Sequence, residues 1–432
     1  MKSFRQRPLH DHPSVSKVDT GNSSPQKVKR LIITRDNIAF CGAVYSMILF
    51  SLYLVNALLG IFLKDTPLMR HVSPYCIDYG VFYTTGKMTL LGQISGIYQL
   101  ETHHAVLEQI MHASLPFYLP WVYPPIFLLA VTPLALLPYS VSLLVWLFLT
   151  MGFALYASYK ILPKQKKLAL LLLGFTGLLM NLRWGQNGFL TTGMIGLGLA
   201  YLEEKPVLSG ICFGLMAYKP QFAIFLFPIL LLSGKWKVFL YACLSALGII
   251  LVSVIFFGTQ TWIDFFRALM QTSSSVFGTE FDDVAAIIVS PLVFVQLLGG
   301  SGIWSTAIQA ILTVSVLGAI VWVWRNTKKI SLWASALILG LPLMMPNYTQ
   351  YDLVLLGLPL ILLAYEYLEN GYRKLELILL ALLWLLPALS WPLVKVTHLQ
   401  ICPLVLIAEM TLVILRIRRE KAIPVMQQPH AT

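Results

Sequence analysis

Long apolar stretches separated by short polar ones run through most of this chain. Twelve of them are candidate membrane-spanning helices, although several are shorter than the roughly 20 residues that a straight span requires. They lie at 38–63, 140–162, 168–182, 188–203, 205–218, 221–234, 237–257, 303–324, 331–345, 351–368, 374–390 and 397–416. The pattern predicts an all-α, polytopic membrane protein with about 12 transmembrane helices.

The distribution of basic residues predicts the orientation of these spans. We place the N-terminus in the cytoplasm and treat 126–138 as a short re-entrant or interfacial helix. Then 24 of the 31 lysine and arginine residues lie on the cytoplasmic side. Counting 126–138 as a full span would reverse every later loop, which the positive-inside rule disfavours. Both termini are therefore expected inside, and the two long segments 64–125 and 258–302 outside.

The amino-acid composition also indicates a membrane protein rather than a soluble one. The chain is 57% hydrophobic and 12% charged, whereas soluble domains carry about 25% charged residues. The formal charge of +12 is explained by cytoplasmic loops, so no nucleic-acid partner is expected. The five cysteines show neither a disulfide framework nor zinc-type spacing, and we predict no metal and no cofactor. Residues 1–37 are expected to form a disordered basic tail, 38–416 a single transmembrane domain, and 417–432 a second cytoplasmic tail.

The first outer segment contains two predicted amphipathic helices. The first begins near Asp78 and is broken by Gly92 and Gly96, and the second covers about 100–113. Helices of this kind lie in the membrane interface and can frame a site that admits a lipid from the bilayer. The second helix carries three histidines, for which a solvated or hydrogen-bonding face is expected rather than a metal site.

Asp78 has two interpretations, which are compatible with each other. An aspartate just before a helix is commonly its N-cap, because the carboxylate accepts hydrogen bonds from the exposed amide groups. The alternative is a general base at the membrane surface, where a partly desolvated carboxylate deprotonates an incoming hydroxyl group.

Other unusual polar residues fall at span ends on the same predicted outer side. Ionisable groups at the membrane edge are energetically costly and therefore indicate a functional site. Each also has a structural interpretation: lysine and arginine extend to lipid headgroups, amides bridge helices, aspartate caps a helix, and aromatic residues form interfacial belts. The candidates for substrate binding are Tyr123, Arg183, Gln186, Asn187, Lys219, Gln350 and Asp352.

A second acidic group lies in the later outer segment. Glu280, Asp282 and Asp283 are near neighbours, and adjacent carboxylates can bind a divalent cation. A solvated acidic loop is the simpler interpretation.

Four motifs in order resemble glycosyltransferase family 87, whose members are integral-membrane enzymes. They are DYGVFYTTGKMTLLGQISGIY, YPPIFLLAVTPLALLP, the WGQNGF run that continues to AYKPQF, and PNYTQYDLVLLGLPL, and the likeness covers roughly 75–416. Near the last motif, where family members often carry a histidine, this chain has Asn347 and Gln350.

The resemblance implies a GT-C-type fold and an activity. It implies transfer of a hexose, mannose in the first instance, from a polyprenyl phosphate to a lipid or glycan acceptor at the extracytoplasmic face, with inversion. Asp78 corresponds to the family's loop aspartate and is the expected base, with Lys219 and Arg183 holding the phosphate. A monomer in the cell (inner) membrane is expected, with its active site on the periplasmic side. A lipid or sugar transporter, and a polymerase or ligase that uses lipid-linked saccharides, are the alternatives.

Overall fold

The computed structural model describes residues 35–62, 76–115, 118–275 and 285–422, and there the chain is almost entirely helical. Within these residues the only extended pairing is an isolated antiparallel bridge between Ile288 and Thr349. The predicted all-α class is therefore confirmed. The predicted tails lie almost wholly outside the described residues, although the last helix continues to Ala422, past the boundary expected at 416.

Each of the twelve predicted apolar segments coincides with helical structure. The elements are α1 (Arg35–Phe62), α5 (Tyr139–Ile161), η3 (Lys166–Gly174) with α6 (Thr176–Trp184), α7 (Gly188–Ala200), α8 (Pro206–Leu215) with η4 (Met216–Tyr218), α9 (Pro220–Leu232), α10 (Trp236–Ser275), α13 (Gly302–Asn326), α14 (Ile330–Met344), η5 (Gln350–Leu356) with α15 (Gly357–Asn370), α16 (Lys374–Thr397) and α17 (Cys402–Ala422). Among the described residues, five helices are long and apolar enough to cross a membrane, or six if the bent η3–α6 pair is one span. The total of 12 spans stays a prediction.

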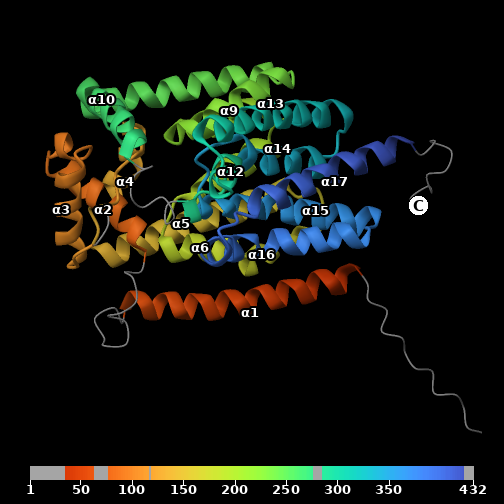
Figure 1. The fold of residues 1–432 in the computed structure, drawn as a ribbon. Coiled ribbons are helices and arrows are strands. Elements are labelled where there is room, and N and C mark those ends of the chain that lie inside the picture. Colours follow the sequence, from red (N-terminus) through yellow and green to blue (C-terminus); the bar gives the residue numbers. More distant parts are fainter. Residues whose placement is uncertain (1–34, 63–75, 116–117, 276–284, 423–432) are drawn as a thin grey trace, which may run out of the picture.

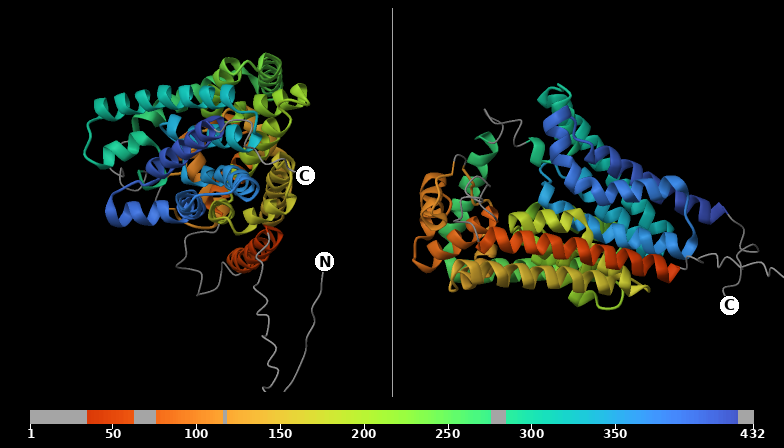
Figure 2. Two further views of the ribbon diagram at one scale, coloured as in Figure 1. Left: turned by 90° about the vertical axis from the view of Figure 1, so that its right-hand side faces the viewer. Right: turned by 90° about the horizontal axis from the view of Figure 1, so that it is seen from below.

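The long helices run roughly side by side, and the two ends of the bundle differ (Figures 1 and 2). Helix α1 begins and α17 ends at one end. The opposite end carries the short elements α2 (Ile77–Leu90), η1 (Ile94–Gly96), α3 (Leu100–Met111), η2 (Pro125–Phe127) and α4 (Leu128–Leu134). The ambiguous segment 126–138 is therefore a short helix. Its apolar run Pro125–Leu134 extends about 15 Å at 1.5 Å per residue, half of what a span needs.

Small residues bring helices into close contact. Gly210 and Gly214 lie on the face of α8 that meets α10. A Cβ atom on Gly214 would come within 2.4 Å of the Ala242 carbonyl oxygen, and one on Gly210 within 2.3 Å of the Tyr241 Cβ. This i, i+4 spacing of small residues is typical of tightly packed membrane helices.

Helix α2 differs from the prediction. It was expected to be an amphipathic helix in the interface, but ten of its fourteen residues are buried. The reason is that aromatic residues occur on several sides of the helix while glycines let its neighbours approach. Tyr79 and Phe82 are buried against other rings, and a Cβ atom on Gly86 would come within 2.6 Å of the α4 backbone. Helix α3 is amphipathic as predicted, with Leu107 buried and Glu101 exposed.

The end of the bundle where α1 begins and α17 ends holds a network of charges. Glu366 is paired with Lys329 at 2.9 Å and with Arg416 at 3.4 Å, and Arg416 also contacts Glu376 at 3.3 Å. These residues tie α14, α15, α16 and α17 together. The opposite end, which carries α2 and α3, has a different polar cluster.

Candidate functional site

The start of α2 is attached to the end of α6. The Cys76 amide donates to the Arg183 carbonyl oxygen at 3.2 Å, and its thiol donates to the Leu182 carbonyl oxygen at 3.3 Å. Gly185 ends α6 with a φ of 70°, and a Cβ atom there would meet the Cβ atoms of Tyr79 at 2.8 Å and Cys76 at 3.0 Å. Only glycine adopts this conformation in so little space, so α2 is held directly over the loop that contains Gln186.

Asp78 is not an N-cap. Cys76 occupies that position in a left-handed conformation without any side-chain capping bond, and Asp78 lies in the first turn of α2. A carboxylate there still interacts favourably with the helix dipole. Its side chain is only partly exposed. Burial raises the pKa of the Asp78 carboxyl group to about 7, although a hydrogen bond with Gln186 and the positive charge of Arg183 both oppose that rise.

A chain of hydrogen bonds continues from Asp78 through Gln186. The Gln186 side-chain oxygen accepts from the Tyr123 hydroxyl at 3.3 Å and from the Asn187 backbone amide at 3.1 Å. Both Gln186 and Tyr123 are buried. The oxygen and nitrogen of the Asn187 carboxamide are buried too, and neither forms a hydrogen bond of regular geometry among the described residues, although the Tyr123 hydroxyl group lies nearby. A buried carboxamide of this kind is well suited to bind the hydroxyl groups of a ligand.

A buried ion pair lies next to this chain. The Lys219 ammonium group is 2.6 Å from an Asp352 carboxylate oxygen, and their side chains are 1% and 4% exposed. The other Asp352 oxygen accepts from the Thr349 hydroxyl at 3.2 Å. The predicted capping role of Asp352 is wrong, because η5 has no side-chain cap and this carboxylate is occupied by Lys219 and Thr349. Lys219 does not extend to lipid headgroups either, since it is enclosed.

Tyr351 connects the ion pair to the rest of the cluster, and it was not among the residues predicted from the sequence. Lys219 lies over its ring at 5.3 Å from the centroid. Its hydroxyl group lies within electrostatic reach of both Asp78 and Asp352. Its place next to Asp352 in the late motif was the only available signal.

The remaining predicted residues are distributed around this cluster. Arg183 is half-buried in the last turn of α6, 5.6 Å from the ring of Trp184 and close enough to act on Asp78. Gln350 is buried and donates to the Pro387 carbonyl oxygen at 2.8 Å, so its amide is engaged with α16. The structure therefore gathers Asp78, Tyr123, Arg183, Gln186, Asn187, Lys219 and Asp352, and it directs the Gln350 amide elsewhere.

The histidines of α3 form hydrogen bonds. The buried His103 ring shares a 2.9 Å hydrogen bond with the Thr85 hydroxyl, and burial lowers the pKa of His103 to about 4. His104 is 3.5 Å from Glu108. In the described part of the chain, no group of three or more histidine, cysteine or acidic residues is placed to hold a metal ion. Glu280, Asp282 and Asp283 lie outside that part.

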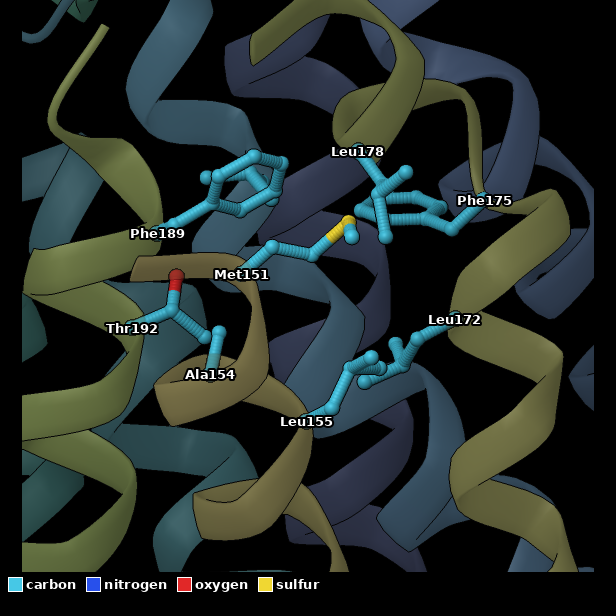
Figure 3. Close-up of a pocket in the computed structure, with 9 residues that line it drawn as sticks. Met151, Ala154, Leu155, Leu172, Phe175, Leu178, Phe189 and Thr192 are labelled. Carbon is cyan, nitrogen blue, oxygen red and sulfur yellow. The ribbon is translucent and has the colours of Figure 1, made fainter. Parts of the chain in front are cut away.

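A small apolar cavity lies within the helical body (Figure 3). Phe189 and Val354, which line it, belong to the same helical segments as Asn187 and Asp352. Its only polar side chain, Thr192, already donates to the Gly188 carbonyl oxygen at 2.8 Å. The cavity is lined by Met151, Ala154, Leu155, Leu172, Phe175, Leu178, Phe189, Thr192 and Val354. The helical segments that carry Asn187 and Asp352 therefore also line an apolar space.

The fold and the cluster together describe a multi-pass membrane protein with a buried polar site at one end. The chain matches the family model for glycosyltransferase family 87 over residues 121–346, just over half of its length. It belongs to that family of GT-C-type membrane glycosyltransferases. No curated protein and no solved structure matches it. The matched range contains Tyr123, Arg183, Gln186, Asn187 and Lys219, whereas Asp78, Gln350 and Asp352 lie outside it.

Proposed function

We propose that this glycosyltransferase transfers mannose from a polyprenyl-phosphate donor to a lipid or glycan acceptor, with Asp78 as the general base. The observation that carries the proposal is the Asp78 carboxyl group. It is partly exposed, its pKa is raised to about 7, and it faces Gln186 and Arg183. A base whose pKa lies near neutrality is the most effective proton acceptor at neutral pH.

The proposed reaction is a single displacement. Asp78 takes the proton of the acceptor hydroxyl group as its oxygen bonds to the anomeric carbon. The bond from that carbon to the phosphate oxygen breaks at the same time, and polyprenyl phosphate leaves with the bonding electron pair. Attack from the face opposite the leaving group inverts the anomeric configuration. The donor carries its own activated sugar, so no cofactor or metal is needed in this scheme.

Arg183 makes the first contact with the phosphate in this proposal. Its guanidinium group is half-buried at the end of α6 and acts on Asp78, so it lies on the same side of the cluster as the base. A cation there stabilises negative charge that develops on the leaving oxygen. Lys219 is neutralised by Asp352 and enclosed, and it reaches a phosphate only after Asp352 releases it.

The Asn187 carboxamide and Tyr123 are proposed to bind the sugar. Neither polar atom of the Asn187 side chain forms a hydrogen bond of regular geometry within the described protein, and leaving them unsatisfied would cost about 1–3 kcal/mol. Sugar hydroxyl groups donate and accept hydrogen bonds and would satisfy both atoms. The working face is proposed to be the periplasmic side of the inner membrane, since α2 and α3 lie at the end opposite the one where α1 begins and α17 ends (Figure 1).

The test is transfer by the purified protein in lipid nanodiscs with synthetic prenyl-phosphate mannose, glucose and arabinose as donors. We expect turnover with the mannosyl donor, an inverted product, and loss of transfer in Asp78→Asn. Glu101→Gln removes an exposed carboxylate of α3 and is the matched control, which should retain full activity. Transfer only from prenyl-diphosphate saccharides would refute the proposed donor and favour the polymerase or ligase alternative. Glycosyl transfer by Asp78→Asn at the wild-type rate would refute the base.

A further inference from the structure

Helix α10 is too long to lie entirely across a membrane. Its apolar candidate span covers 36 residues, Trp236–Gln271, or about 54 Å at 1.5 Å per residue, against a hydrocarbon core of about 30 Å. The helix bends at Gly258, whose φ of 78° and ψ of 164° are not helical. Beyond the bend, residues 259–271 turn across the end of the bundle that carries α2 and α3 (Figures 1 and 2).

The direction of this second part is fixed by contacts on both sides of the bend. The Trp262 indole N–H donates to the Ser253 hydroxyl oxygen at 3.1 Å, across Gly258. The Phe265 ring is buried and lies 6.0 Å from the ring of Tyr98. The Tyr98 hydroxyl donates to the Tyr123 carbonyl oxygen at 2.9 Å. One face of residues 259–271 is therefore attached to the loop that supplies Tyr123 to the candidate site.

A second face of residues 259–271 is polar. At about 100° per residue, Gln260, Asp264 and Arg267 lie on this face, and Asp264 contacts both Gln260 at 2.9 Å and Arg267 at 3.5 Å.

The remaining face is apolar, and it is exposed. Ile263, Phe266 and Leu269 are spaced three residues apart and are 44%, 53% and 45% exposed. Just before the bend, Ile255 and Phe256 are 79% and 70% exposed on a segment whose composition suits a membrane span. Exposed apolar side chains thus occur on both sides of the bend, on the candidate span and on residues 259–271. A helix with one buried, one polar and one exposed apolar face fits the boundary between headgroups and acyl chains.

We propose that residues 259–271 form an interfacial helix whose Ile263–Phe266–Leu269 face binds the lipid bilayer surface at the end of the molecule that carries the candidate site. The polar face then meets the headgroups, and the buried face transmits the position of the membrane surface to Tyr123 through Phe265 and Tyr98. The proposal concerns membrane binding and is independent of the chemistry at Asp78.

The experiment measures the depth of spin labels in the full-length protein reconstituted into phosphatidylcholine–phosphatidylglycerol vesicles. Cys41 and Cys243, the two cysteines that are not buried, are replaced by alanine. Single cysteines are then introduced at Ile263 or Phe266, with Gln260 on the polar face as the matched control. All three positions are at the surface, so labelling should leave the fold intact, and a thermal melt checks this.

We expect labels at positions 263 and 266 to collide with oxygen in preference to a water-soluble nickel chelate, at a depth of about 5–10 Å. The label at position 260 should show the reverse preference. Equal chelate accessibility at all three positions would overturn the proposal, because the apolar face would then lie in water. Protection of positions 263 and 266 from both reagents would also overturn it, because protein rather than lipid would cover that face.

Discussion

The Lys219–Asp352 pair gives the most quantitative test of the site. Its 2.6 Å separation corresponds to roughly 6 kcal/mol of Coulomb attraction at an effective dielectric constant of about 20, most of which offsets desolvation. Because the side chains are 1% and 4% exposed, water cannot replace a missing partner. Removing one member of a buried pair typically costs about 3–5 kcal/mol, whereas replacing both with apolar residues is often neutral or stabilising.

We therefore expect Lys219→Met and Asp352→Leu each to lower the melting temperature of the purified protein, and the double variant to recover most of the loss. At roughly 2 °C per kcal/mol, the lower end of the usual range, each single variant should melt about 6–10 °C below wild type. Lys235→Met is the control, since Lys235 pairs with the largely exposed Glu203 and such surface pairs contribute less than about 1 kcal/mol. A double variant as unstable as the worse single variant, or single variants as stable as the control, would refute the reasoning.

Donor kinetics on the same variants separate two roles for Lys219. If the Lys219–Asp352 pair only supports Tyr351 and its neighbours, the stable double variant should keep kcat/KM for the donor within a few-fold of wild type. Arg183→Ala should then lose about 10- to 150-fold, the equivalent of a charge-assisted hydrogen bond of about 1.5–3 kcal/mol. If Asp352 instead releases Lys219 to the phosphate, the stable double variant should show that loss as well. The second result would assign the phosphate contact to Lys219.

Four further predictions concern the same end of the molecule. The transfer rate should rise with pH through about 7, since the Asp78 carboxyl group must lose its proton to act as a base. Asp78→Asn should lose about 10²–10⁴ in rate, and its remaining rate should not rise with pH near 7. Because burial disfavours the charged carboxylate, Asp78→Asn should also melt no lower than wild type at pH 8, and a lower melting temperature would contradict the raised pKa. Gly185→Ala should destabilise the protein by more than about 1–2 kcal/mol, because Gly185 is in the left-handed conformation and has no room for a Cβ atom. Gly152 has open space around it, so Gly152→Ala should not lower the melting temperature. A cysteine at the exposed Gln99 should react with an impermeant reagent in intact cells, and reaction only after permeabilisation would overturn the orientation.

The helices were predictable because a membrane leaves few alternatives for the backbone. In a hydrocarbon environment every amide and carbonyl group needs an internal partner, so long apolar segments become helices. Their approximate limits follow from charged and proline-containing breaks such as Lys160–Lys167 and Lys219–Pro220. The family membership also followed from sequence, since its motifs are local patterns. Helix α2 was mispredicted because its burial depends on glycine contacts with α3 and α4, which no local pattern reports.

Most residues of the site could be predicted from the sequence, but the contacts between them could not. Polar residues at span ends are unusual enough to identify Asp78, Arg183, Gln186 and Lys219 individually. The Lys219–Asp352 contact joins residues 133 positions apart, and it depends on how α9 and η5 pack. The capping role expected for Asp78 failed because Cys76, anchored to the end of α6, takes the capping position in a left-handed conformation.

The pairing pattern also divides the charged residues of the site into two classes. Lys219 and Asp352 cancel each other inside the protein, so they add little net charge where a substrate would bind. Asp78 and Arg183 carry opposite charges and are both partly exposed, and the positive charge of Arg183 acts on the Asp78 carboxyl group. A donor with a phosphate and an acceptor with a hydroxyl group need one cation and one proton acceptor that are both accessible. In the proposed reaction Asp78 and Arg183 take these two roles, whereas the enclosed Lys219–Asp352 pair gives the site rigidity.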